Sequence, residues 1–161
     1  MSTSTDGILA YGYDLGGEES EWKVEGAGEY GELPPLGWYN PEADDADFMG
    51  AALETLLAAQ GFTDVWVRGA DNAAYFANRK AAEAAVGVDL ECYCSNEFPM
   101  FLVAAKTIRV GRGRVKTIDW QALGRERVEQ DWDGKLAAAL SVLGLVPKQT
   151  APAWLLVSYW G

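Results

Sequence analysis

Carboxylates are the chemically active side chains that this sequence concentrates in one place. Residues 1–50 contain twelve of the 24 acidic residues and one base, Lys23, whereas residues 51–161 contain twelve acids and twelve bases. The formal net charge of −11 therefore belongs to the first third of the chain. Carboxylates at high density can imitate nucleic-acid phosphates, which lie about 1.7 Å apart along a duplex, and can compete for a basic groove. Alternatively, the same charge serves only to keep the protein in solution.

Six glutamates in the Gly-rich stretch 15–40 form the predicted partner-binding surface. If they share a face, they present a row of negative charge to a basic partner. The six are Glu18, Glu19, Glu21, Glu25, Glu29 and Glu32. We expect this stretch to be an ordered, irregular loop because four aromatic residues in it need burial. These are Trp22, Tyr30, Trp38 and Tyr39.

The absence of histidine removes much of the enzyme chemistry open to a chain of 161 residues. Histidine is the commonest general base, the usual partner of a nucleophilic Ser or Cys, and a common zinc ligand. Cys92 and Cys94 would point to the same apolar face of a strand, so we interpret them as small buried hydrophobes rather than metal ligands. The sequence predicts no metal site, no cofactor and no catalytic residue.

Aromatic residues at the ends of the first and last expected strands offer an alternative site. Tyr13, Tyr159 and Trp160 could line a concave pocket with convergent carboxylates. Carboxylates can act as both acid and base, although no pair stands out by its spacing. The alternative function is therefore a small-molecule binder or a carboxylate-based enzyme.

Two further charged clusters have simpler interpretations. Asp44, Asp45 and Asp47 fit the start of a helix better than a divalent-cation site. Four bases lie in or beside an expected hairpin, where alternation would place three of them on one face. They are Arg109, Arg112, Arg114 and Lys116. Because the net charge is strongly negative, we expect them to be internal counterions to the acidic first third of the chain, or a charged sheet edge, rather than a nucleic-acid site.

Hydrophobic periodicity predicts an α+β fold with about five to six strands and about three helices. The expected strands cover 7–13, 64–68, 88–94, 101–110, 114–118 and 154–160, with 21–25 as a further short edge strand. The last strand is expected to be buried at the centre of the sheet. The expected helices cover 44–60, 72–86 and 129–143. We expect one domain over 1–161, with a mostly antiparallel mixed sheet and the helices mainly on one face.

Three segments together carry a family resemblance: residues 6–17, residues 79–94 and residues 154–161. They resemble small uncharacterised acidic proteins of actinobacteria such as Streptomyces and of their phages. The resemblance spans residues 6–161 and implies a cytoplasmic, phage-type protein with no known activity. A cytoplasmic location also agrees with the lack of a run of about 18 apolar residues and of a signal peptide.

The favoured function is a non-enzymatic interaction protein that binds a host or phage macromolecule through its acidic third. The expected partner is a protein, with a basic nucleic-acid-binding protein as one candidate. Its identity and the oligomeric state of this chain stay open.

Overall fold

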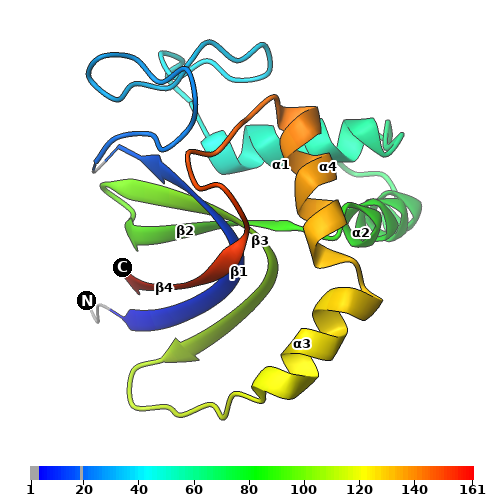
Figure 1. Cartoon of the computed structure of the whole chain (residues 1–161). Helices are drawn as coiled ribbons and strands as arrows, with labels where there is room; N and C mark the ends of the chain where they lie inside the picture. Colours follow the sequence, from blue (N-terminus) through cyan, green and yellow to red (C-terminus); the bar gives the residue numbers. More distant parts are fainter. Residues whose placement is uncertain (1–3, 19) are drawn as a thin grey trace.

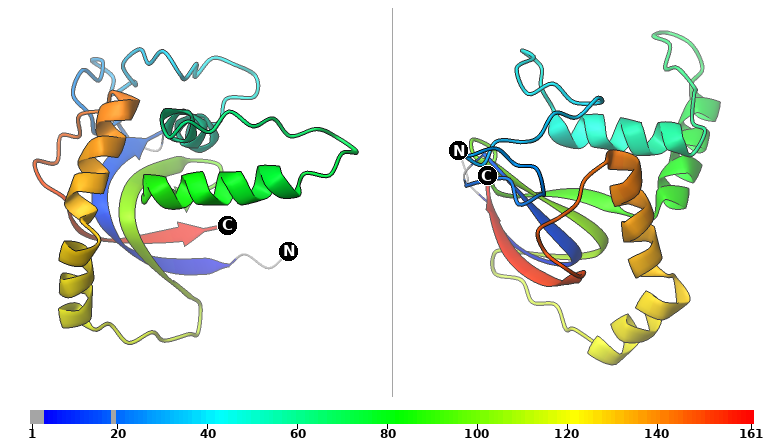
Figure 2. Two further views of the ribbon diagram at one scale, coloured as in Figure 1. Left: turned by 90° about the vertical axis from the view of Figure 1, so that its right-hand side faces the viewer. Right: turned by 45° about the horizontal axis from the view of Figure 1, so that its top comes forward.

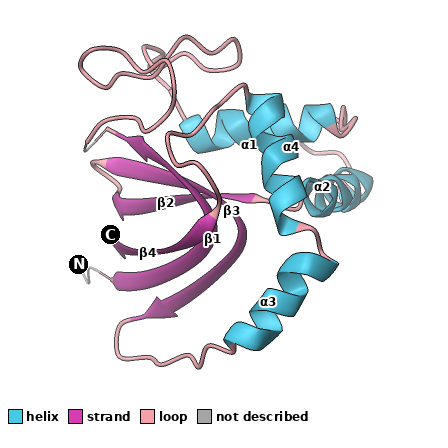
Figure 3. Ribbon diagram, viewed as in Figure 1, coloured by secondary structure: helices cyan, strands magenta, loops and turns pink. Residues whose placement is uncertain are grey.

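The computed structural model describes residues 4–18 and 20–161 and sets a small, strongly curved sheet beside four helices (Figures 1 and 3). The strands are β1 (Thr5–Gly17), β2 (Asp89–Ser95), β3 (Pro99–Gly111) and β4 (Ala153–Trp160). The helices are α1 (Phe48–Ala59), α2 (Ala73–Val86), α3 (Trp120–Glu129) and α4 (Trp132–Leu143). The predicted α+β class is confirmed. The described part of the chain has fewer strands and more helices than predicted.

The four strands close into a small barrel in the order β1-β3-β2-β4. β1 pairs antiparallel with both β3 and β4, and β2 pairs antiparallel with β3. A short parallel contact closes the ring, where Cys94 and Ser95 of β2 pair with Tyr159 and Trp160 of β4. The sheet is therefore mixed and mostly antiparallel, as predicted.

Bulges bend β1 so that it can take part in a closed barrel of so few strands. Its register with β3 shifts between Tyr11 and Gly12, and again between Asp14 and Gly16. At Gly12 a Cβ atom would overlap the Val103 carbonyl of β3. Glycine at this position lets the two backbones approach each other closely.

Hydrophobic side chains fill both faces of the curved sheet. Inside the barrel, Ile8 and Ala10 of β1 and Leu102 and Ala104 of β3 are completely buried. The outer face carries a larger core, in which residues of β1, β2 and β3 meet residues of α1 and α4. Figure 2 shows these two helices beside the barrel. The most buried members of this core include Leu15, Leu57, Val103, Leu136 and Leu143.

Side-chain caps begin three of the helices. Asp47 accepts a hydrogen bond from the Gly50 N–H at 3.0 Å and begins α1, so the predicted start at Asp44 is corrected. Asp119 caps α3 and Asp131 caps α4 in the same way. Because Asp131 also has a positive φ of 50°, it separates α3 from α4, and the single helix predicted over 129–143 is wrong at its first turn.

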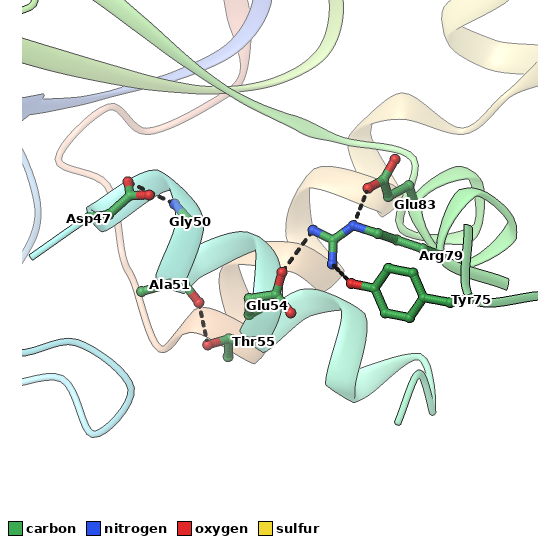
Figure 4. A network of polar contacts seen from close by, with 8 residues as sticks. All are labelled: Asp47, Gly50, Ala51, Glu54, Thr55, Tyr75, Arg79 and Glu83. Carbon is green, nitrogen blue, oxygen red and sulfur yellow. Dashed lines mark hydrogen bonds and ion pairs between the residues drawn. The ribbon is translucent and has the colours of Figure 1, made fainter. Parts of the chain in front are cut away.

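A guanidinium holds α2 against α1 (Figure 4). Arg79 of α2 forms ion pairs with Glu54 of α1 at 2.7 Å and with Glu83 at 3.1 Å. It also donates a hydrogen bond to the Tyr75 hydroxyl at 3.3 Å. The Arg79–Glu83 pair has the i,i+4 spacing of neighbours on one helix, whereas the contact with α1 depends on tertiary structure.

Two predicted strands are loops in the structure. In segment 64–68, the Asn72 side chain accepts from the Val67 N–H and donates to the Val67 carbonyl, which occupies the groups that a neighbouring strand would bind. Segment 114–118 follows a turn at Gly113, with φ of 75°, and leads into α3 instead of pairing back on β3. Residues 120–129 form a helix that the sequence analysis missed.

Segment 21–25 makes isolated bridges through Trp22 and Val24 rather than a strand. β4 is also less buried than predicted. Among the described residues, β4 contacts helices only near its start and β2 only near its end. Leu156 lies between these contacts and is therefore 79% exposed. None of the described helices is long and apolar enough to cross a membrane.

Candidate functional site

The acidic segment is residues 18–47, and its described part, 18 and 20–47, is a long loop at one end of the molecule (Figures 1 and 2). Backbone hydrogen bonds fasten its first part to two distant parts of the chain. The Lys23 N–H donates to the Leu15 carbonyl at 2.8 Å, and the Glu25 N–H donates to the Val146 carbonyl at 2.7 Å. The Lys148 N–H donates to the Lys23 carbonyl at 2.9 Å. The segment is thus tied to β1 and to the connection between α4 and β4.

Aromatic side chains anchor the acidic segment in the outer core. Trp22 is buried, with its ring stacked on Phe101 at 5.6 Å and tilted against Phe48 at 4.8 Å. The Trp38 indole N–H donates to the Leu143 carbonyl at 2.9 Å. These contacts agree with the expectation that the aromatic residues hold this loop in place.

One aromatic residue departs from that expectation. Tyr30 is 89% exposed and lies between two of the predicted partner-binding residues in sequence. Tyr39, by contrast, is half-buried and packs edge-on against Phe48 at 5.4 Å. Tyr30 is therefore an aromatic surface within the negative region rather than an anchor.

The carboxylates of the acidic segment lie in solvent. The exposed acids described there are Glu18, Glu21, Glu25, Glu29, Glu32, Glu42, Asp44, Asp45 and Asp47. None of them forms an ion pair with any residue of 4–18 or 20–161. The one base of the segment, Lys23, pairs with Asp14 of β1 at 2.6 Å instead. Glu19, also predicted to bind the partner, lies outside the described residues.

The fold gathers some of these acids and separates others. The Trp22 N–H donates to the Gly31 carbonyl, so residues 26–32 fold back onto Glu21, whose side chain lies against Gly31. Glu21, Glu29 and Glu32 thus belong to one lobe. Glu25 sits apart from this turn, where its backbone meets Val146.

Glu18 and Asp47 mark the base of the acidic segment, where it leaves β1 and enters α1. Both act on the Tyr39 hydroxyl: burial raises the pKa of Tyr39, and the negative charges of Glu18 and Asp47 raise this pKa further. The carboxylates of Glu18 and Asp47 thus act on the same phenol from the two ends of the acidic segment.

A shallow pocket of about 380 Å³ opens within the acidic segment. Its lining combines apolar side chains with one carboxylate: Leu33, Pro34, Pro35, Leu36, Tyr39, Asn40, Pro41 and Glu42. An apolar wall with a carboxylate suits a lysine or arginine, which has an aliphatic stem and a charged end.

The three residues of the alternative aromatic site are not brought together. Tyr159 pairs with Asp6 and Trp160 with Thr5 at the start of β1, whereas Tyr13 lies near the other end of that strand. This separation follows from antiparallel pairing, which places the ends of the first and last strands at opposite sides of the sheet.

Tyr159 does lie among carboxylates, but a cation already pairs with them. The Arg109 guanidinium forms ion pairs with Asp6 and Glu91, both at 3.1 Å, and lies 5.9 Å from the centre of the Tyr159 ring. The Tyr159 hydroxyl donates to the Asn96 side chain at 2.6 Å. Arg109 therefore acts as an internal counterion, one of the two roles expected for the bases of this region.

A polar cluster at Asp14 escaped sequence analysis. The Asp14 carboxylate accepts hydrogen bonds from the Tyr93 hydroxyl at 2.8 Å and from Lys23 at 2.6 Å. Burial, followed by this hydrogen bond, raises the pKa of Tyr93. No sequence signal could have found the cluster, because Asp14 and Tyr93 are 79 positions apart.

The cysteines are half-buried and unbonded to each other. Burial raises the pKa of the Cys92 thiol, which makes it a weaker nucleophile and metal ligand at neutral pH. Within the described chain, no group of three or more Cys, Asp or Glu side chains could hold a metal ion.

The remaining bases of the predicted hairpin lie on an exposed connection, residues 112–118, which we call the basic strap. It runs from β3 to α3 and carries Arg112, Arg114 and Lys116. As far as the structure describes the chain, these three bases form no ion pair.

Comparison with known proteins gives no relative: no family model, no curated protein and no solved structure matches this chain.

Proposed function

We propose that this protein is a non-enzymatic interaction protein whose acidic segment binds a basic surface of a macromolecular partner. We also propose the biological setting that the sequence resemblance implies, a cytoplasmic phage-type protein of an actinobacterial system. The observation that carries the binding proposal is the set of exposed carboxylates that form no ion pair with any described residue. They are held on a loop that is tied to the core at Trp22, Val24 and Trp38.

Anchoring matters because it lowers the cost of binding. A flexible acidic tail must lose conformational entropy when it meets a partner, whereas a loop already fixed by backbone hydrogen bonds loses less. The acidic segment therefore offers a prepared negative surface. Complementary charge speeds association and discriminates against acidic surfaces.

A nucleic-acid-binding protein is the partner class that we favour. Its groove binds phosphates through lysine and arginine, and the carboxylates of the acidic segment offer the same charge. The pocket beside Glu42 could take one such side chain, with Leu33 and Pro41 against its aliphatic stem. The small-molecule alternative has no comparable support, since Tyr13 lies apart from Tyr159 and Trp160.

Capture from host lysate at low and high salt tests the proposal. The wild-type protein should retain a basic nucleic-acid-binding protein at low salt and release it at high salt or on addition of duplex DNA. The Glu18→Lys/Glu21→Lys variant should lose this capture, because it reverses two carboxylates that have no partners to lose within the described chain.

A matched control separates the site from net charge. The Glu129→Lys/Gln121→Lys/Ser141→Lys variant changes the net charge by the same four units at exposed helical positions, and it should still capture the protein. The proposal would be contradicted if capture did not depend on salt concentration, or if the Glu18→Lys/Glu21→Lys variant still captured the protein.

A further inference from the structure

We propose that the basic strap binds the acidic segment of a second copy of this chain, so that the protein self-associates head to tail. This inference rests on the proposed function, because it takes the acidic segment as a binding surface and identifies one surface that it binds. Two features of the molecule support it: the positions of the two charged regions and the composition of each.

The acidic segment and the basic strap lie at opposite ends of the molecule. In Figures 1 and 2 the acidic segment is beyond one end of the barrel, and the strap and α3 are beyond the other. Within one copy, no described acid of the segment forms an ion pair with a base of the strap. Contact between two copies would bring these opposite charges together.

The basic strap is a local cationic surface on a protein of negative net charge. Residues 99–118 contain five bases and no acids: Lys106, Arg109, Arg112, Arg114 and Lys116. The first two are engaged by Glu126 and by Asp6 and Glu91, whereas the three bases of the strap are exposed. Arg125 of the adjoining α3 is exposed as well.

Apolar groups accompany the charge on both surfaces. On the strap side, Val115 is 92% exposed and Trp120 is 55% exposed. On the acidic side, Tyr30 is 89% exposed beside Glu29. An arginine of the strap could lie over the Tyr30 ring within about 6 Å, a contact that adds to the attraction of the carboxylates.

Net repulsion between two copies of charge −11 does not prevent this contact. At physiological ionic strength, charges more than about 8 Å apart are largely screened, so the surfaces in contact dominate. The contact joins two different surfaces, and repetition of such a contact gives a closed ring or an open chain. We therefore expect the average mass to rise with protein concentration.

Sedimentation velocity of the full chain, over a range of concentrations and salt, is the test. The wild-type protein should associate at low salt and dissociate as salt rises. The strap variant Arg112→Glu/Arg114→Glu and the segment variant Glu25→Lys/Glu29→Lys should each associate at least about tenfold more weakly. Mixing these two variants should restore association, because each then meets a surface of opposite charge.

A control at another exposed surface tests whether net charge alone acts. Arg68→Glu/Lys80→Glu changes the charge as much as the strap variant does, at exposed bases of the α1–α2 connection and of α2. This variant should associate like the wild type. Its failure to do so would overturn the proposal, as would a wild-type protein that stays monomeric at low salt.

Two further outcomes separate this inference from the proposed function. If the strap variant associates like the wild type but no longer binds a short DNA duplex, the strap serves nucleic acid and the inference fails. If self-association is absent while the acidic segment still captures a basic protein in a salt-dependent way, the inference fails and the proposed function stands.

Discussion

The barrel leaves no room for a Cβ atom at Gly12. A Cβ there would overlap the Val103 carbonyl, and backbone atoms of a paired strand cannot move aside cheaply. We expect Gly12→Ala to lower the free energy of unfolding by about 2–3 kcal/mol, measured by chemical denaturation. Gly124→Ala is the control: a Cβ in this part of α3 meets nothing, so the variant should gain up to about 1 kcal/mol. Equal stability of the two variants would contradict this account.

Tyr11 links the middle of β1 to α4, and it should make the free energy of unfolding depend on pH in the alkaline range. Burial, followed by its hydrogen bond to Asp133 at 2.8 Å, raises the pKa of Tyr11 to about 12 from 10.0. Below pH 10 the phenol is neutral in both the folded and the unfolded protein, so its full contribution to the free energy of unfolding is present. As pH rises from about 10 to about 12, the unfolded chain loses the proton first, so stability falls.

The measurement is the unfolding free energy across this pH range. Tyr11→Phe should flatten the fall, although Tyr13, Tyr39 and Tyr93, whose pKa values are also raised, continue to contribute. Tyr30→Phe, at an exposed position, should leave the profile unchanged. An identical fall in the wild-type and Tyr11→Phe proteins would exclude the proposed role of this hydroxyl.

Among the secondary-structure elements, α2 is held in place by few groups. Arg79 connects it to α1 through Glu54, and most of the helix is exposed. Arg79→Met should destabilise α2 by about 1 kcal/mol or less, because Glu54 is itself 59% exposed and water weakens the pair. Hydrogen exchange of the α2 amides should quicken, whereas Lys80→Met, at the exposed neighbouring position, should leave it unchanged. Unchanged exchange in Arg79→Met would show that apolar contacts alone hold α2.

At the scale of the whole molecule, charge is divided between two ends of one fold. The acidic segment is tied to the core by Trp22 and Trp38, so its charges are placed by the same packing that stabilises the barrel. The basic strap is placed by the end of β3 and the beginning of α3. Both binding proposals depend on this separation, and both predict contacts that weaken as salt rises.

Local sequence patterns determined where most elements lie. Strict alternation located β2, and apolar runs bounded by turn residues located the other three strands. Gly87, with a φ of 68°, ends α2 directly after Val86. The same patterns suggested strands at 64–68 and 114–118, where β-branched residues occur without a partner strand. A high β-propensity shows that a segment can form a strand, but the strand forms only where a partner strand can pair with it.

The sequence by itself determined the α+β class, the main strands, and the concentration of negative charge in the first third of the chain. Tertiary structure alone decided the closure of the barrel, the contact of Tyr93 with Asp14, and the separation of Tyr13 from Tyr159. It also decided that the acidic segment and the basic strap lie at opposite ends. The physical reason is range: capping and alternation act over a few neighbouring residues, whereas register, closure and charge placement depend on residues far apart in the chain.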